Sequence, residues 1–73
     1  MTFEYKKLSG RIKEKFGSQK VFAAAMRLSE RSLSLKICGR VDWKQAEIMR
    51  ACELLGIAPE EIHSYFFILV VQD

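Results

Sequence analysis

The sequence has three thiol or imidazole side chains, Cys38, Cys52 and His63, which are candidate nucleophiles or transition-metal ligands. Their spacing does not match the closely paired ligands of a zinc site. His63 has no nucleophile and carboxylate at useful spacing, and no phosphate-binding glycine-rich loop or catalytic-triad signature is present. We therefore expect no enzyme and no metal or other cofactor. With only two cysteines and no secretory signal, both thiols are expected to be reduced, in a cytoplasmic protein.

The chain has 73 residues, which is enough for one domain and leaves little room for an enclosed substrate pocket. Its formal net charge is +3, but the charge is distributed unevenly. Residues 1–41 carry ten bases and three acids, whereas residues 42–73 carry two bases and six acids. This asymmetry predicts that the first half faces an anionic partner, either nucleic acid or protein. The plainer alternative is a solvated basic helix beside a solvated acidic one.

Apolar residues recur at intervals of three and four, which predicts short helices separated by turn residues. The predicted helices cover residues 4–16, 19–26, 30–38, 43–55 and 60–66. Ser18, Ser29 and Asp42 are the predicted N-caps of the second, third and fourth helices. Gly10 lies in the middle of the first predicted helix. Because it has no side chain, we expect it to allow a close contact with another helix. The fold class is therefore all-α, a compact bundle of about five short helices in a single domain, residues 1–73.

The second and third predicted helices are joined only by Arg27, Leu28 and Ser29, so residues 18–38 are expected to form a helix-turn-helix. In that motif the second helix lies in the DNA major groove and the first crosses the backbone. Arg27 stands where this turn usually has glycine, because the chain often adopts a positive φ there. A left-handed Arg27 would cost about 1 kcal/mol.

Four runs of residues carry a resemblance that spans nearly the whole chain. They are residues 7–12 (KLSGRI), 28–36 (LSERSLSLK), 43–44 (WK) and 62–67 (IHSYFF). The chain resembles the Cro and repressor class of phage proteins, and more closely the modulator of repression family of temperate phages with its Cro-like relatives. The resemblance implies a transcriptional regulator of the lysis–lysogeny switch whose partner is the lysogenic repressor.

In the repressor class, base readout comes from positions that match Glu30, Arg31 and Leu35. Arg31 suits guanine O6 and N7, but Glu30 is repelled by the duplex and Leu35 can touch only a thymine methyl or another apolar surface. From the resemblance and the flanking basic residues, we expect a surface that binds DNA or the repressor. Its residues are Gln19, Lys20, Ser29, Glu30, Arg31, Ser32, Ser34, Leu35, Lys36 and Arg40.

Two functional hypotheses follow from this surface. The first is an antirepressor or corepressor that binds the lysogenic repressor, with or without operator DNA, because an apolar Leu35 beside charged neighbours is typical of a protein interface. The second is a Cro-like repressor that binds operator DNA directly through the third helix. A third interpretation makes Leu35 a core residue, although helical geometry puts it about 200° from Leu33.

The last seven residues, 67–73, form a short apolar tail with a predicted strand or docked segment at Ile68 to Val71. The apolar run from Tyr65 to Val71 is too short to span a bilayer, so no membrane partner is expected. The run is also too apolar to be expected to remain fully exposed to solvent. The tail is expected to contact a partner or a second copy, as a homodimer, or else to cover its own core.

Overall fold

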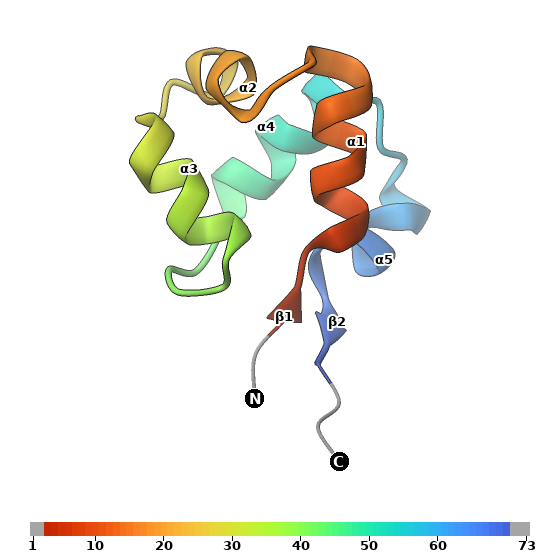
Figure 1. The fold of residues 1–73 in the computed structure, drawn as a ribbon. Coiled ribbons are helices and arrows are strands. Elements are labelled where there is room, and N and C mark those ends of the chain that lie inside the picture. Colours follow the sequence, from red (N-terminus) through yellow and green to blue (C-terminus); the bar gives the residue numbers. More distant parts are fainter. Residues whose placement is uncertain (1–2, 71–73) are drawn as a thin grey trace.

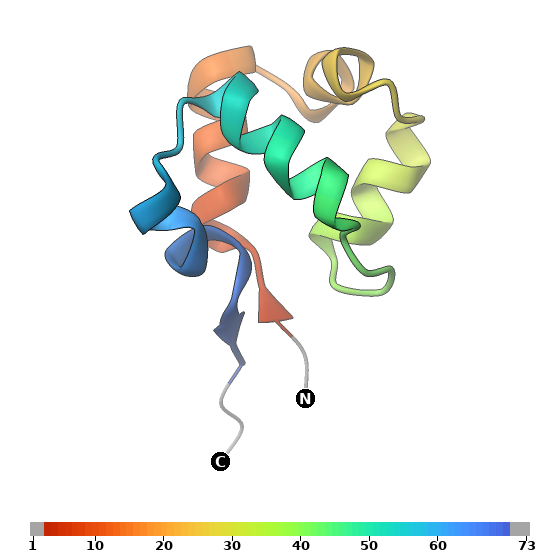
Figure 2. The ribbon, with the colours of Figure 1, turned by 180° about the vertical axis from the view of Figure 1, so that it is seen from behind.

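The computed structural model describes residues 3–70 of the chain. The elements follow in the order β1 (Phe3–Glu4), α1 (Lys6–Phe16), α2 (Gln19–Met26), α3 (Glu30–Ile37), α4 (Gln45–Leu55), η1 (Pro59–Glu61, a 3-10 turn), α5 (Ile62–Phe66) and β2 (Ile68–Leu69). Figure 1 shows α1 between α3 on one side and α5 on the other, with α2 above α3 and level with the upper end of α1. Seen from behind in Figure 2, α4 runs across the space between α3 and α1. The predicted all-α bundle of five short helices is confirmed.

One fully buried cluster joins all five helices. On α1 the predicted stripe places Leu8 and Ile12 in the interior, at 0% and 1% exposure. The other fully buried large side chains are Phe22, Leu33, Leu55 and Phe66. Burial of each such side chain stabilises the fold by about 1.5–3 kcal/mol. Phe22 belongs to α2 and Leu33 to α3, so each of these two helices is anchored in the core by one buried side chain. The core therefore fixes how α2 and α3 are oriented on the rest of the domain.

A serine side chain caps the N-terminus of each of the two helices, α2 and α3, that the three-residue connection joins. The Ser18 hydroxyl accepts the Val21 N–H at 3.3 Å, and the Ser29 hydroxyl accepts the Ser32 N–H at 3.0 Å, which confirms both predicted N-caps. Arg27 ends α2 with φ 61° and ψ 36°, in the left-handed region. Arg27 therefore adopts the positive φ that usually favours glycine at this position of the turn.

Two local predictions are wrong for physical reasons. The fourth helix begins at Gln45 after Lys44, so Asp42 is not its N-cap. The capping carboxylate belongs instead to Glu47, which accepts the Lys44 N–H at 2.8 Å. Gly10 is exposed, and a Cβ atom there would meet nothing within 4 Å. The predicted close contact of another helix at Gly10 is therefore not made.

The chain ends meet in a small antiparallel ribbon, in which Phe3 pairs with Leu69 and Glu4 with Ile68. Glu4 is therefore part of a strand rather than of the first helix. The predicted strand in the tail is confirmed at two residues, Ile68–Leu69, which pair with the N-terminal strand of the same chain. Residues 71–73 of the tail lie outside the described residues. Self-association through the tail stays a prediction.

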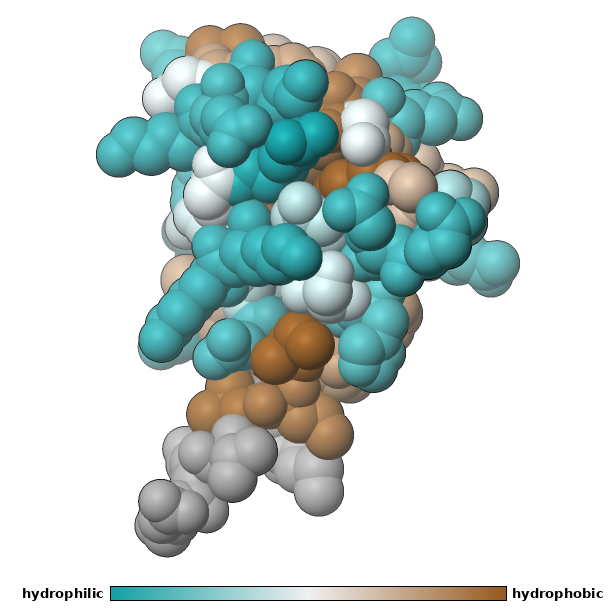
Figure 3. Space-filling model, turned by 90° about the vertical axis from the view of Figure 1, so that its right-hand side faces the viewer, coloured by the Kyte–Doolittle hydropathy of each residue, from teal (hydrophilic) through white to brown (hydrophobic). Residues whose placement is uncertain are grey.

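Apolar surface gathers at this ribbon. Phe3, Phe67 and Leu69 are each about two-fifths exposed, and Figure 3 shows the apolar colouring concentrated at the ribbon end of the molecule. Across residues 3–70, every helix falls short of the length and apolarity that crossing a membrane would require.

Replacing Arg27 with glycine should stabilise the domain, because glycine adopts the left-handed conformation without a steric penalty. We expect the free energy of unfolding to rise by about 0.5–1 kcal/mol in a urea titration. Arg40→Gly, in the connection after α3, is the matched control and should give no gain, since Arg40 has no positive φ. Equal losses of stability in both variants would contradict a strained Arg27.

Candidate interaction surface on α2 and α3

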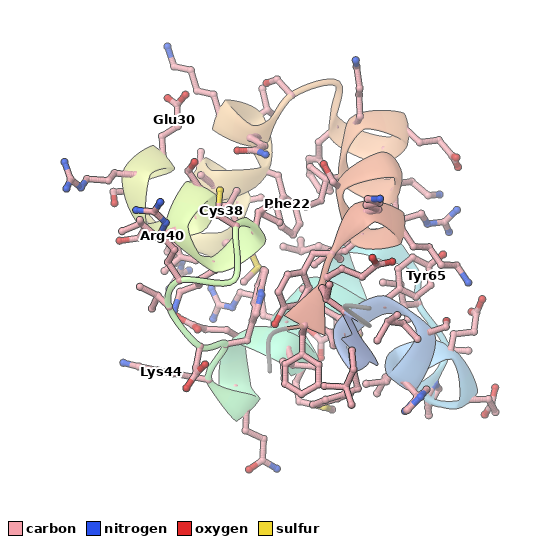
Figure 4. The ribbon with its side chains drawn as sticks, turned by 60° about the horizontal axis from the view of Figure 1, so that its bottom comes forward. Phe22, Glu30, Cys38, Arg40, Lys44 and Tyr65 are labelled. Atoms are coloured by element: carbon pink, nitrogen blue, oxygen red, sulfur yellow. The ribbon has the colours of Figure 1, made fainter. Side chains whose placement is uncertain are left out.

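The outward side of α3 carries four of the ten predicted binding residues. Helical geometry gathers five side chains on this side, which we call the α3 face: Glu30, Arg31, Ser34, Leu35 and Cys38. Glu30, Arg31 and Cys38 are exposed, while Ser34 and Leu35 are half-buried. Figure 4 shows Glu30 pointing outward, with Arg40 on the same side of the molecule. The α3 face is therefore a mixed charged, polar and apolar surface.

Leu35 belongs to this surface rather than to the core, because it is absent from the apolar side chains that pack against the buried cluster. Its carbonyl accepts the Arg40 N–H at 3.0 Å and the Val41 N–H at 3.3 Å. These bonds, with Gly39 at φ 78°, turn the chain back beside α3. They bring Val41, which is 42% exposed, next to the end of α3.

Val41 is a surface residue that sequence reasoning missed. The signal was present, because a glycine just after a helix often reverses the chain and an apolar residue near it often contacts the last turn.

The two serines at the start of α3 are engaged with each other. Ser29 Oγ donates to Ser32 Oγ at 2.9 Å and also accepts the Ser32 N–H. Their hydroxyls therefore serve the first turn of the helix, which leaves Glu30 and Arg31 as the outward groups there.

Gln19 and Lys20 begin α2, a separate element from the α3 face. Lys20 is exposed. Gln19 is half-buried and lines a shallow hollow of about 290 Å³ between α1 and α2, together with Ile12 and Lys13 of α1. Gln19 thus lies against the first helix, and Lys20 is the more accessible of the two.

Lys36 is the clear exception among the predicted binding residues. It is 4% exposed, and its ammonium lies 3.0 Å from the Glu47 carboxylate. It also donates to the Asp42 carbonyl at 3.0 Å. The prediction that Lys36 is a flanking cation for a partner is wrong, because Lys36 follows Leu33 by three residues and so shares its inward side. That spacing was visible in the sequence, but its acidic partner was not.

The Lys36–Glu47 pair sets the electrostatics beneath the α3 face. Burial acts to raise the pKa of Glu47, but the hydrogen bonds from the Lys44 N–H and the Lys36 ammonium, together with the charges of both lysines, outweigh it. The pKa of Glu47 is therefore lowered from its ordinary value of 4.5. Glu47 is ionised at neutral pH, and the pair joins the inner side of α3 to the start of α4.

The residues with metal-ligand or nucleophile chemistry lie apart. Cys38 is exposed after α3, whereas Cys52 is buried in α4, where burial raises the pKa of its thiol. His63 is exposed on α5 and stacks on Phe67, with 6.5 Å between ring centroids. Within the described range, no cluster of three or more histidine, cysteine or acidic side chains could hold a metal ion.

Comparison with known proteins places this fold in a defined family. The family model described as "Protein of unknown function (DUF739)" matches residues 1–68, and the chain belongs to that family. A solved structure, the modulator of repression (MOR) of the temperate bacteriophage TP901-1 from Lactococcus lactis, is similar to it at 48% identity and a TM-score of 0.79. The match covers 92% of this chain and 90% of that one. A search of curated proteins gave no match.

The resemblance to the modulator of repression family that the sequence indicated is confirmed by this match. Similarity at this level over nearly the whole of both chains supports a phage regulatory role.

Removing the carboxylate of the buried pair should destabilise the domain in a pH-dependent way. At pH 7, Glu47→Gln leaves the Lys36 charge without its partner, and we expect a loss of roughly 2–3 kcal/mol in the free energy of unfolding. Because the folded-state pKa of Glu47 is lowered, its contribution is present above about 4.5 and disappears as the pH falls through the folded-state value.

Urea titrations of the wild-type chain and Glu47→Gln at pH 7 and pH 3 check this, and the difference in stability should be smaller at pH 3 than at pH 7. Glu14→Gln is the matched control, because Glu14 pairs with Arg11 at the exposed surface of α1. It should change stability by less than about 0.5 kcal/mol. A loss for Glu47→Gln that is equal at both pH values would be evidence against the buried ion pair.

Proposed function

We propose that this chain regulates transcription at the lysis–lysogeny switch of a temperate phage by binding the lysogenic repressor through a helix-turn-helix formed by α2 and α3. The proposal covers action as an antirepressor or a corepressor, with or without operator DNA. It is supported by the similarity to the modulator of repression of phage TP901-1, whose name states a role in repression.

The composition of the α3 face carries the proposal. Because Lys36 is turned into the interior, Arg31 is the one cation on the outward side of the helix. Its neighbour Glu30 repels phosphates, which supply most of the affinity of proteins for DNA. A helix that reads the major groove gains little from this arrangement.

The same surface suits a protein partner. Leu35 is only half-buried and free of the core, and the exposed Val41 lies beside the same end of the helix. Two apolar side chains flanked by Arg31, Glu30 and Arg40 have the anatomy of a protein interface, in which an apolar centre is bordered by charged groups.

Direct binding of operator DNA is the second candidate function. Lys20, Arg31 and Arg40 are exposed, and all lie in the half of the chain that carries the positive charge. The N-terminal turns of α2 and α3 also present backbone N–H groups that suit phosphate oxygens. A Cro-like repressor would use these groups together and would bind without any partner.

A titration of labelled operator DNA separates the two candidates. The DNA is titrated with this chain alone, with the repressor alone, and with both together. We expect no saturable binding by the chain alone, and a release or alteration of the repressor complex when the chain is added. Saturable binding by the chain alone that weakens steeply with salt would favour the Cro-like function instead.

Leu35→Asp tests which surface makes the contact. A charge at the apolar centre of the interface should weaken the effect on the repressor complex by about 30-fold or more. Met49→Asp is the matched control, since Met49 is a 54% exposed apolar side chain on α4. Circular dichroism establishes that both variants are folded. Full activity of a folded Leu35→Asp would remove Leu35 from the interface.

A further inference from the structure

A pocket lined mainly by aromatic rings lies outside the α3 face, between the α3–α4 connection, the ribbon and α5. Its volume is about 260 Å³. Three of its rings form a continuous inner wall: the centroids of Tyr5 and Trp43 lie 6.2 Å apart, and those of Trp43 and Phe66 lie 5.2 Å apart. Tyr5 and Phe66 are buried, at 8% and 1% exposure, so this wall is part of the rigid core.

Two further rings complete the pocket from the ribbon side. Phe3 and Phe67 meet edge to face, with 5.7 Å between their centroids. Both are exposed, at 38% and 40%, so they stand at the rim, and the half-buried Trp43 is the most accessible ring of the inner wall. Segments from both ends of the chain therefore build the opening together.

One carboxylate belongs to this mainly aromatic lining. Asp42 lines the pocket and is exposed. It takes part in neither of the ion pairs found among residues 3–70, because Lys36 bonds to its backbone carbonyl and pairs with Glu47 instead. Burial, and then the charge of Asp42, raise the pKa of Tyr5, which agrees with an Asp42 carboxylate that acts on the pocket wall.

We propose that this pocket binds an arginine side chain presented by a partner protein. A guanidinium group stacks on aromatic faces and pairs with a carboxylate through two parallel hydrogen bonds, while its aliphatic stem packs on apolar walls. The pocket offers all three features in one place, and its volume is sufficient for one such side chain. Nucleic acid does not fit the site, because the carboxylate of Asp42 repels phosphate groups.

The inference goes beyond repressor binding by the α3 face and does not depend on it. Asp42 and Trp43 follow α3 in the connection to α4, and the remaining lining comes from the ribbon, α4 and α5. A variant that abolishes contact at Leu35 leaves this pocket intact. The two proposals can therefore fail separately.

Trp43 is the sole tryptophan of the chain and reports on the pocket directly. Its fluorescence is followed while the full chain is titrated with the capped tripeptide acetyl-Gly-Arg-Gly-amide. The matching tripeptide with norleucine in place of arginine is the apolar comparison. We expect a saturable change in emission for the arginine peptide, with an affinity at least about fivefold higher than for norleucine.

Asp42→Asn removes the charge and keeps the shape of the side chain. It should weaken binding of the arginine peptide by roughly three- to tenfold and leave the norleucine peptide unaffected. Glu53→Gln, at an exposed acid of α4 outside the pocket, is the matched control and should change neither affinity. Absence of a saturable change with the arginine peptide would overturn the proposal. Equal affinities for both peptides, unaltered by Asp42→Asn, would overturn it as well.

Discussion

The contact between Lys36 and Glu47 organises the half of the molecule that carries the proposed partner surface. The contact keeps the Lys36 ammonium away from the outward surface of α3. It also joins the inner side of that helix to the first turn of α4 through the Glu47 carboxylate. The same carboxylate caps α4 at Lys44, and the same ammonium holds the Asp42 carbonyl. Such a pair is costly to break, because the Lys36 ammonium, whose side chain is 6% exposed, is poorly solvated once the Glu47 carboxylate is removed. The course of the α3–α4 connection depends on it.

Two surfaces acquire their character from this arrangement. On the α3 face, the loss of Lys36 leaves Arg31 beside Glu30 and makes the apolar Leu35 and Val41 more prominent. On the other side of the connection, Asp42 lines an aromatic pocket, and its carboxylate has no ion-pair partner among residues 3–70. The uneven charge of the sequence, basic before residue 42 and acidic after it, therefore does not translate into a uniformly basic partner surface.

Local signals predicted the helices and two of their caps. The spacing of Leu8 and Ile12 identified the buried side of α1, and Ser18 and Ser29 identified the starts of α2 and α3, because these effects act within one helical turn. The errors concern contacts between distant residues. Asp42 and Glu47 are both plausible capping acids, and the choice between them follows from the tertiary contact of Glu47 with Lys36. The ribbon joins residues from the two ends of the chain, so no local pattern indicates that Phe3 faces Leu69.

The proposed binding surface also combines locally predictable features with a long-range contact. Helical periodicity correctly placed Leu35 away from Leu33. Lys36 was predicted as a binding residue, although its spacing of three from Leu33 puts it on the inward side, where a lysine is buried only with an acidic partner. The sequence does not specify that partner. The aromatic pocket was beyond local reasoning for the same reason, since its walls come from the ribbon, the α3–α4 connection, α4 and α5.

A double-mutant cycle between Lys36 and Glu47 tests the central claim most directly. The free energy of unfolding is measured at pH 7 for the wild-type chain, Lys36→Met, Glu47→Gln and the double variant. A buried pair that holds the connection should give a coupling energy of about 1.5 kcal/mol or more. A coupling below about 0.3 kcal/mol would mean that the two residues act independently and would contradict an organising role for the pair.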